Sequence, residues 1–412
     1  MQLYAKESSA ITKGQHLFMA YAHKYFPQLQ TYQDEMLQRL ETMVNIDSGT
    51  GQVEGVNQII LSLKEWLSEL GFAVTLHEEE GFGYNLVARR TGRGYTRLLL
   101  VGHVDTVYGP GTALTHPFTV RDGLAFGPGV IDMKSSVVMG IYVLRALLEA
   151  GFEQYGELCV VFNNDEEVGS PGSTSLIREI ARHIDVGLVL EPSRAADVIT
   201  KSRKGSDKYV LEVFGVPAHS GAEPHKGRSA VIELAHKMLA IHNLNTLFHG
   251  VTYNVTRISS SEPLNIVPDV ARCHISVRAH DLHSLDLAEE TMQRIIAGSS
   301  IPDTRSVLTR KPGRKPYKAT PEVMQLVTMA QAEGTAFDLE LIAEGKGGVS
   351  DANTLMEVGV PTLDSLGSIG GGMHDLNREF LRVDSLSLRG AMLAGLIERI
   401  CLSKSTGIEP SS

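Results

Sequence analysis

Hydrophobic and polar residues follow two different periods along this chain, and these periods distinguish helices from strands. In residues 55–70, apolar side chains recur every three or four positions and Gly71 follows, which predicts an amphipathic helix. Further helices are predicted at 32–46, 135–150 and 173–182. Short, nearly all-apolar runs at 97–102, 158–162 and 186–190 are typical of strands buried on both faces of a sheet, and shorter strands are expected at 72–76 and 85–89. This alternation predicts an α/β fold.

The pattern changes near residue 205. In residues 271–278, apolar and polar side chains alternate, which is typical of an antiparallel strand with one buried face. Strands at 209–213 and 251–258 and helices at 228–242 and 284–297 give the order β-α-β-β-α-β over 205–310, a split βαβ arrangement. The Pro- and Gly-rich stretch Lys311–Pro316 is predicted to be a hinge. After it the α/β pattern returns, with helices at 321–333 and 384–400 and strands at 338–342 and 361–367.

These patterns predict two domains. A mixed-sheet α/β domain is expected to comprise residues 1–204 and 313–412, and a smaller α+β domain of the split βαβ, ferredoxin-like type is expected to be inserted at 205–312.

Composition and charge limit the classes of molecule that this chain is expected to bind. The 412 residues include 38 basic and 48 acidic side chains, for a net charge of −10. An acidic chain is poorly suited to nucleic acid or anionic membranes, which attract basic patches. The three cysteines lie far apart and form no CxxC motif, which indicates a reducing compartment. The N-terminus lacks an apolar run of signal-peptide length, and no stretch is long enough to span a membrane, so a cytoplasmic location is expected.

Residues able to bind metal follow the predicted buried strands at their C-terminal ends. They are His103 after strand 97–102, Asp132 after a glycine-rich loop, Glu167 after strand 158–162, Glu191 after strand 186–190 and His374 after strand 361–367. Open α/β sheets place their ligand sites at this edge. Carboxylates gathered without basic partners are costly unless a cation lies among them. Two imidazoles with several carboxylates therefore predict zinc, with cobalt or manganese as substitutes.

The number of candidate ligands predicts two metal ions per chain. One zinc takes about four ligands, and a catalytic zinc leaves one position for water, so this set exceeds one site. A bridging carboxylate would complete two neighbouring sites. Asp105 lies two residues after His103 and could accept the imidazole N–H. Glu166 and Glu167 could divide two roles, one binding metal and the other taking a proton from a bridging water.

Other interpretations of the glycine-rich segments fit less well. Gly127-Pro128-Gly129 lacks the spacing of a dinucleotide-binding motif, and Gly345–Gly348 lacks the spacing of a P-loop. Residues 348–352 approach the nucleophile elbow of a serine hydrolase, but the last glycine is missing. A nucleotide-binding α/β protein and an inactive metal-binding scaffold are the alternatives of a different class; the presence of Glu166 argues against the scaffold.

Seven stretches together resemble one family. They are GHVDTV (102–107), GPGVIDMK (127–134), NDEEVGSPGS (164–173), LEPS (190–193), PAHSG (217–221), NIVPD (265–269) and GGMHDLNREF (371–380). In this order and spacing they resemble the dinuclear zinc exopeptidases and deacylases. That family includes glutamate carboxypeptidase, acetylornithine deacetylase, succinyl-diaminopimelate desuccinylase and aminoacylase. The resemblance is greatest to the bacterial glutamate carboxypeptidase branch.

The resemblance implies a role for each candidate residue at the metal centre. Asp132 would bridge the two metals, and a cis peptide bond would follow it. His103 and Glu191 would complete one site, and Glu167 and His374 would complete the other. Asp105 would support His103, and Glu166 would be the general base.

The resemblance also implies roles for the inserted domain. This domain would be a lid that forms a homodimer, and its His219 would reach the active site of the partner subunit and polarise the scissile carbonyl. Arg278 and Asn265 match positions that contact a substrate carboxylate, and Gly347 and Gly348 could bring backbone close to the substrate. A guanidinium suits a carboxylate because it can donate two parallel hydrogen bonds.

The predicted function is hydrolysis of an amide bond by a zinc-dependent metallocarboxypeptidase or amidohydrolase. The substrate would be a peptide or N-acyl amino acid, and the product a C-terminal amino acid, with glutamate favoured. A deacylase of other specificity is the alternative within the enzyme class. Neither nucleic acid nor membrane is an expected partner.

Overall fold

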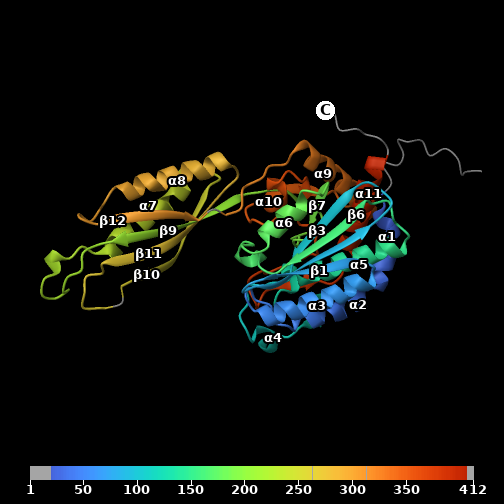
Figure 1. Cartoon of the computed structure of the whole chain (residues 1–412), viewed down its shortest axis with the longest axis horizontal. Helices are drawn as coiled ribbons and strands as arrows, with labels where there is room; N and C mark the ends of the chain where they lie inside the picture. The colour runs from blue at the N-terminus through green and yellow to red at the C-terminus, as the bar shows by residue number, and fades with distance from the viewer. Residues whose placement is uncertain (1–19, 262, 312, 406–412) are drawn as a thin grey trace, which may run out of the picture. The chain divides into compact units, whose positions relative to one another are not determined.

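The computed structural model describes residues 20–261, 263–311 and 313–405, which divide into two compact units (Figure 1). Unit 1 is formed by described residues of Met1–Lys201, Ala319–Glu344 and Ser350–Ser412. Unit 2 is formed by described residues of Ser202–Lys318 together with Gly345–Val349. The short return of the chain to unit 2 at Gly345–Val349 differs from the predicted boundaries. This segment belongs to unit 2 because the backbone N–H of Lys204 donates a hydrogen bond to the carbonyl of Lys346 (3.0 Å).

A six-stranded sheet forms the centre of unit 1. Its strand order is β1 (Ala73–Glu79), β2 (Gly83–Thr91), β6 (Glu157–Asn163), β3 (Arg97–His103), β7 (Val186–Val189) and β14 (Thr362–Leu363). The strands β6, β3, β7 and β14 run parallel, whereas β1 and β2 are antiparallel to their neighbours. Strands β3, β6 and β7 are almost fully buried, which explains their near-continuous apolar sequences. The parallel strands bring their C-terminal ends to one edge of the sheet.

Helices surround this sheet in Figure 1. They are α1 (Ala22–Thr31), α2 (Gln33–Val44), α3 (Val53–Glu69), α4 (Thr112–Thr115), α5 (Ser135–Glu149), α6 (Thr174–Ala181), α9 (Pro321–Gly334), α10 (Asp351–Glu357) and α11 (Ser385–Ser405). Helix α5 is buried on nearly all sides, so its sequence is apolar all round, and α11 packs against it and against α1. Among the described residues, no helix combines the length and apolarity needed to cross a membrane.

Two smaller sheets complete the strands near unit 1. One has the order β15 (Gly370–Gly371), β16 (Phe380–Arg382), β5 (Leu124–Phe126) and β4 (Thr119–Arg121). The other pairs β8 (Val198–Arg203) with β13 (Ile342–Lys346), and both of these strands cross the boundary between the units.

Unit 2 is a four-stranded antiparallel sheet with two helices. The strand order is β10 (Thr252–Ser260), β11 (Val270–Ala279), β9 (Gly205–Phe214) and β12 (Arg305–Lys311), and the helices are α7 (Ala230–Leu247) and α8 (Leu282–Ala297). Alternate residues of β9 and β11 are buried in a core that they share with both helices. The β-α-β-β-α-β order predicted from the sequence is the order observed.

Two predicted strands of unit 1 differ from the structure. Residues 338–342 were predicted as a strand, but Asp338 has a left-handed backbone (φ 55°) after a 3-10 turn, and pairing begins only at Ile342. Residues 361–367 were predicted as one strand, but only Thr362–Leu363 pair as β14. The next residues follow β7 in an irregular path because Ser365 is also left-handed (φ 58°).

All three cysteines, Cys159, Cys273 and Cys401, are buried and free. Burial raises the pKa of the Cys159 thiol to about 12 and that of Cys273 to about 11. Neither thiol is therefore ionised near neutral pH.

Candidate metal centre

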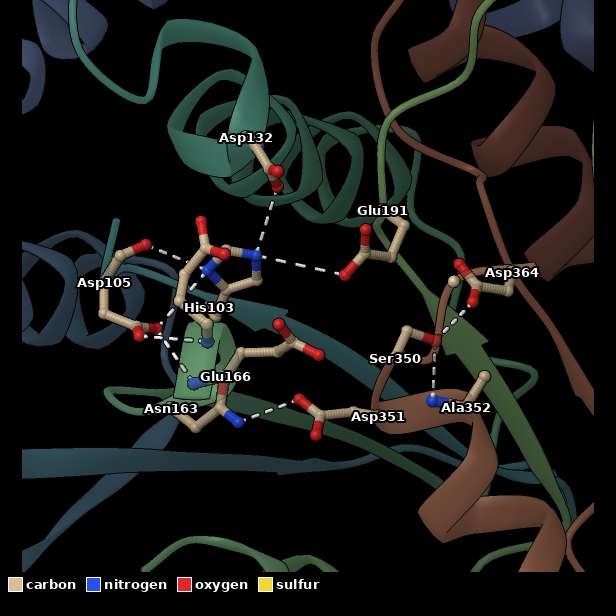
Figure 2. Close-up of polar contacts among 12 residues, drawn as sticks. His103, Asp105, Asp132, Asn163, Glu166, Glu191, Ser350, Asp351, Ala352 and Asp364 are labelled. Carbon is tan, nitrogen blue, oxygen red and sulfur yellow. Dashed lines mark hydrogen bonds and ion pairs between the residues drawn. The ribbon is translucent and has the colours of Figure 1, made fainter. Parts of the chain in front are cut away.

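His103 ends strand β3 with its imidazole between carboxylates on both sides (Figure 2). Its Nε2 lies 3.3 Å from Oδ1 of Asp132 and 3.9 Å from Oε1 of Glu191. On the opposite side of the ring, Nδ1 lies 3.0 Å from the backbone carbonyl oxygen of Asp105 and 3.4 Å from its Oδ1. A neutral ring that donates its Nδ1–H to these oxygens presents the lone pair of Nε2 toward Asp132 and Glu191, where it can bind a metal.

Asp132 faces a second imidazole with its other oxygen. Nε2 of His374 lies 3.2 Å from Oδ2 of Asp132 and 3.3 Å from Oε2 of Glu167. The two oxygens of one carboxylate thus point to two different histidines that are far apart in the sequence. The peptide bond between Asp132 and Met133 is cis, as the resemblance implied.

Two groups of side chains could each hold a metal ion. One is His103, Glu166 and Glu191, and the other is Asp132, Glu167 and His374. Within each group, the possible ligand atoms lie within 4.8 Å of one another. The structure therefore brings together all five predicted metal ligands, and it places Glu166 within the first group.

The electrostatics of these groups favour positive charge. Burial opposes protonation of His103, but the hydrogen bonds and charges of Asp105 and Asp132 outweigh it and raise the pKa of His103 well above its usual value. Hydrogen bonds with Asp132 and Glu167 raise the pKa of His374 to about 10. Burial raises the pKa of Glu167. Imidazole nitrogens and carboxylate oxygens are the usual ligands of zinc in catalytic sites, so this donor set fits divalent cations.

Asp105 connects three segments of the site. Its Oδ1 accepts a hydrogen bond from the backbone N–H of Glu166 (3.0 Å), and its Oδ2 accepts one from the N–H of Glu167 (3.2 Å). The hydroxyl of Thr50 donates to Oδ2 as well (2.7 Å). Asp105 is fully buried. It therefore orients the turn that bears both glutamates in addition to contacting His103, and sequence reasoning missed this second contact and Thr50.

Asp351 supports the same turn from the N-terminal end of α10. Its Oδ2 accepts from Nδ2 of Asn163 (2.8 Å), which ends strand β6 (Figure 2). Its Oδ1 accepts from the hydroxyl of Ser170 (2.9 Å). Ser350 is the N-cap of α10 and donates its hydroxyl to Asp364 (2.6 Å). This capping role explains the serine that resembled a nucleophile elbow.

His219 and Asn265 lie together on paired loops of unit 2. The N–H of Ser220 donates to the carbonyl of Asn265 (2.9 Å), and His219 forms a β-bridge with Ile266. Nδ1 of His219 accepts hydrogen bonds from the backbone N–H groups that follow it, at Gly221 (3.2 Å) and Ala222 (3.1 Å). These contacts place the proton of the neutral ring on Nε2, so the exposed side of His219 is a hydrogen-bond donor.

Arg278, Gly347 and Gly348 also lie together in unit 2. Arg278 is near the end of β11 and donates from Nη1 to the carbonyl of Gly347 (3.1 Å). The carbonyl of Gly348 accepts from Nη1 of Arg203 (3.0 Å). Arg203 is buried and was not predicted, because nothing in its local sequence distinguishes it from a surface arginine.

Comparison with known proteins identifies the family. A family model described as Peptidase family M20/M25/M40 matches residues 99–399. The chain belongs to this family. As an M20 peptidase it is a hydrolase of the metallo-carboxypeptidase and amidohydrolase class, and the family predicted from the sequence motifs is confirmed.

Individual relatives of this M20 peptidase support the same assignment. Carboxypeptidase G2 from Pseudomonas sp. (strain RS-16) is 33% identical over 375 residues, which cover 89% of this chain and 89% of the relative. A succinyl-diaminopimelate desuccinylase from Rhodopseudomonas palustris is 29% identical over 344 residues, covering 76% and 85%. A tripeptidase structure from Staphylococcus aureus has a TM-score of 0.76 at 22% identity, covering 90% and 99%. This last similarity supports the mixed α/β fold class alone, which is also as predicted.

Proposed function

We propose that this M20 peptidase is a zinc-dependent enzyme that releases a C-terminal amino acid, with glutamate favoured, from a peptide or N-acyl conjugate. The observation that carries the proposal is Asp132, whose two oxygens face His103 and His374 at 3.3 and 3.2 Å. A carboxylate in this position suits a bridge between two cations. The 33% identity to carboxypeptidase G2 supports the carboxypeptidase assignment.

In this proposal five side chains bind two zinc ions, with cobalt or manganese as substitutes. Asp132 would serve both ions, His103 and Glu191 would hold one of them, and Glu167 and His374 would hold the other. Two such cations would polarise the amide carbonyl and acidify a shared water molecule, so that hydroxide forms near neutral pH.

The remaining residues orient the substrate and move protons. Glu166 is the general base: it takes a proton from the attacking water and returns it to the leaving nitrogen. Asp105 keeps the backbone of Glu166 in place through a 3.0 Å hydrogen bond. His219 would donate its Nε2–H to the carbonyl oxygen, where negative charge develops. Arg278 and Asn265 would bind the terminal carboxylate, with the backbone at Gly347 and Gly348 beside it.

A deacylase of other specificity is the second candidate function. The 29% identity to a succinyl-diaminopimelate desuccinylase favours it, because that relative is named for removal of a succinyl group. Both functions use the same metal centre and differ in the acyl group.

We further propose that unit 2, predicted as the domain 205–312, is a lid that forms a homodimer in the cytoplasm. Strand β10 ends the sheet order of unit 2, and a terminal strand can pair with a second copy. Helix α7 exposes Ile232 (49%) and Leu239 (64%), apolar side chains that a partner would cover.

The test combines metal analysis with a substrate screen. The purified full chain is expected to bind two equivalents of zinc, to lose activity after chelation and to regain it with zinc or cobalt. A panel of dipeptides and N-acyl amino acids should show faster release of glutamate than of neutral residues. Two bound metals with no amide hydrolysis would support the inactive scaffold instead, and faster cleavage of succinyl conjugates would favour the deacylase.

A further inference from the structure

Glu379 is a buried carboxylate that binds the backbone around Asp132. Its Oε1 accepts hydrogen bonds from the N–H groups of Ile131 (3.0 Å) and Asp132 (3.4 Å). Its Oε2 accepts from the N–H of Gly129 (3.2 Å) and from the hydroxyl of Tyr108. Only 1% of Glu379 is exposed. A buried carboxylate is costly unless its oxygens are satisfied, and here four donors satisfy them.

Gly129 brings the backbone close enough for this contact. It has a left-handed backbone (φ 70°), and a Cβ atom there would lie 2.5 Å from Cγ2 of Thr106. The loop that presents Asp132 is therefore packed tightly on one side and bonded to Glu379 on the other.

Glu379 and His374 lie on one closed turn. The N–H of Asp375 donates to the carbonyl of Gly372 (3.0 Å), and the N–H of Glu379 donates to the carbonyl of Asp375 (2.8 Å). A Cβ atom at Gly372 would lie 2.0 Å from the carbonyl oxygen of Arg378, so the turn closes on itself. His374 has a left-handed backbone (φ 65°), which a side chain of this size adopts only when its surroundings fix it. A shift of Glu379 would therefore move His374.

We propose that Glu379 is a positioning residue that fixes Asp132 relative to His374 and so sets the metal group Asp132, Glu167 and His374. The proposal rests on the proposed function, because it assumes that these residues bind a cation. Asp132 would serve both metal ions, so both sites depend on Glu379, but the site with His374 depends on it through Asp132 and also through the turn that bears His374. Glu166 and Glu191 lie on the segments after β6 and β7, which Glu379 does not anchor through any of these four hydrogen bonds.

The substitution Glu379→Gln keeps the shape of the side chain but removes one of its two hydrogen-bond acceptors. The amide has one accepting oxygen, and its NH₂ group cannot accept a hydrogen bond. In either orientation of the amide, the N–H of Gly129 or the N–H groups of Ile131 and Asp132 lose an acceptor. The hydroxyl of Tyr108 can rotate and accept from the NH₂ group, so that contact survives. The loss therefore falls on the loop that presents Asp132.

The experiment is a zinc titration of the metal-free full chain with a competing chromophoric chelator, supported by the visible spectrum of the cobalt-loaded protein. Glu379→Gln is expected to weaken zinc binding about 10–100-fold, the range typical of residues that orient metal ligands, and to weaken the site with His374 more than the site with His103. Tyr108→Phe should weaken zinc binding in the same order of sites but by a smaller factor. The matched control is Glu398→Gln, because Glu398 is also a buried carboxylate that accepts from a tyrosine, Tyr25 on α1.

Each outcome separates this proposal from the proposed function. If the wild type, Glu379→Gln and Tyr108→Phe all bind two zinc ions with the same affinity, the proposed role of Glu379 is wrong while the enzyme assignment stands. An equal loss in Glu398→Gln would also overturn it, since the effect would then be general destabilisation. If Glu379→Gln does not fold, as judged by circular dichroism, Tyr108→Phe decides. A wild type that binds no zinc would overturn both proposals.

Discussion

Asp105 offers the sharpest test of how the site is organised, through the substitution Asp105→Asn. The carboxylate accepts hydrogen bonds from the backbone of Glu166 (3.0 Å) and Glu167 (3.2 Å) and from the hydroxyl of Thr50 (2.7 Å). The asparagine has nearly the same shape, but its NH₂ group must replace one of the two accepting oxygens. Wherever it is placed, it faces at least one backbone donor that then lacks an acceptor.

The magnitude follows from these contacts. A hydrogen bond to a charged group contributes about 1.5–3 kcal/mol. If the lost hydrogen-bond energy adds to the free-energy barrier of the step in which Glu166 transfers a proton, kcat/KM falls about 10–150-fold. About 1.4 kcal/mol corresponds to a factor of ten. His103 also loses the negative charge beside its Nδ1 (3.4 Å), so zinc affinity should fall as well.

The assay measures kcat/KM, zinc affinity and melting temperature for Asp105→Asn and a control. The control is Glu233→Gln in unit 2, where the carboxylate is buried and accepts from the N–H groups of Ser300 (2.8 Å) and Ile301 (2.7 Å). It should lower the melting temperature without changing zinc affinity. If Asp105→Asn keeps kcat/KM and zinc affinity within twofold of wild type, this carboxylate does not organise the site.

Four further substitutions test separate parts of the molecule. Glu166→Gln should bind both metals and lose about 10²–10⁴-fold in kcat, because the amide cannot take a proton; metal analysis and steady-state kinetics check this. His219→Ala should lower kcat about 10²–10³-fold with unchanged metal content, as expected for loss of a donor to a developing oxyanion. Arg278→Ala should lower kcat/KM more for substrates with a free α-carboxylate than for their amides, measured on matched pairs. Arg389→Met should destabilise unit 1 by about 3 kcal/mol or more in urea unfolding, because its buried guanidinium donates to three backbone carbonyls.

Specific results would contradict these expectations. Full activity of Glu166→Gln would show that another group is the base. Unchanged kinetics of His219→Ala would remove this histidine from the reaction. Equal losses on carboxylates and amides would remove Arg278 from carboxylate binding. For Arg389, a loss under about 1 kcal/mol would show that water or neighbouring donors satisfy the three carbonyls.

Much of the candidate metal centre could be located from the sequence because the signals are local. His103 and Glu191 directly follow apolar runs that form buried parallel strands, and such strands end at a common edge. The split βαβ order of unit 2 was equally accessible, since Ala271–Val277 alternate with the period of a half-buried strand. In both cases the residues near in sequence determine the structure.

The parts that were missed depend on contacts between distant residues. Glu379 lies 250 residues from Gly129, and its sequence neighbours give no sign that it is buried. Helix α1 was not predicted because Pro27 interrupts the helical pattern, yet Tyr25 and Leu29 are buried in the core of unit 1. The path after β14 depends on Ser365, whose left-handed backbone is supported by its neighbours in the fold.

The buried cysteines make this protein convenient for labelling. Thiol reagents attack the thiolate, and Cys159, Cys273 and Cys401 are shielded from solvent in the folded state. A cysteine introduced on the surface of each unit would therefore be the preferred target for a spectroscopic probe, without removal of any native thiol. Distances between two such probes, recorded with and without bound substrate, would reveal whether the two units move against each other during turnover.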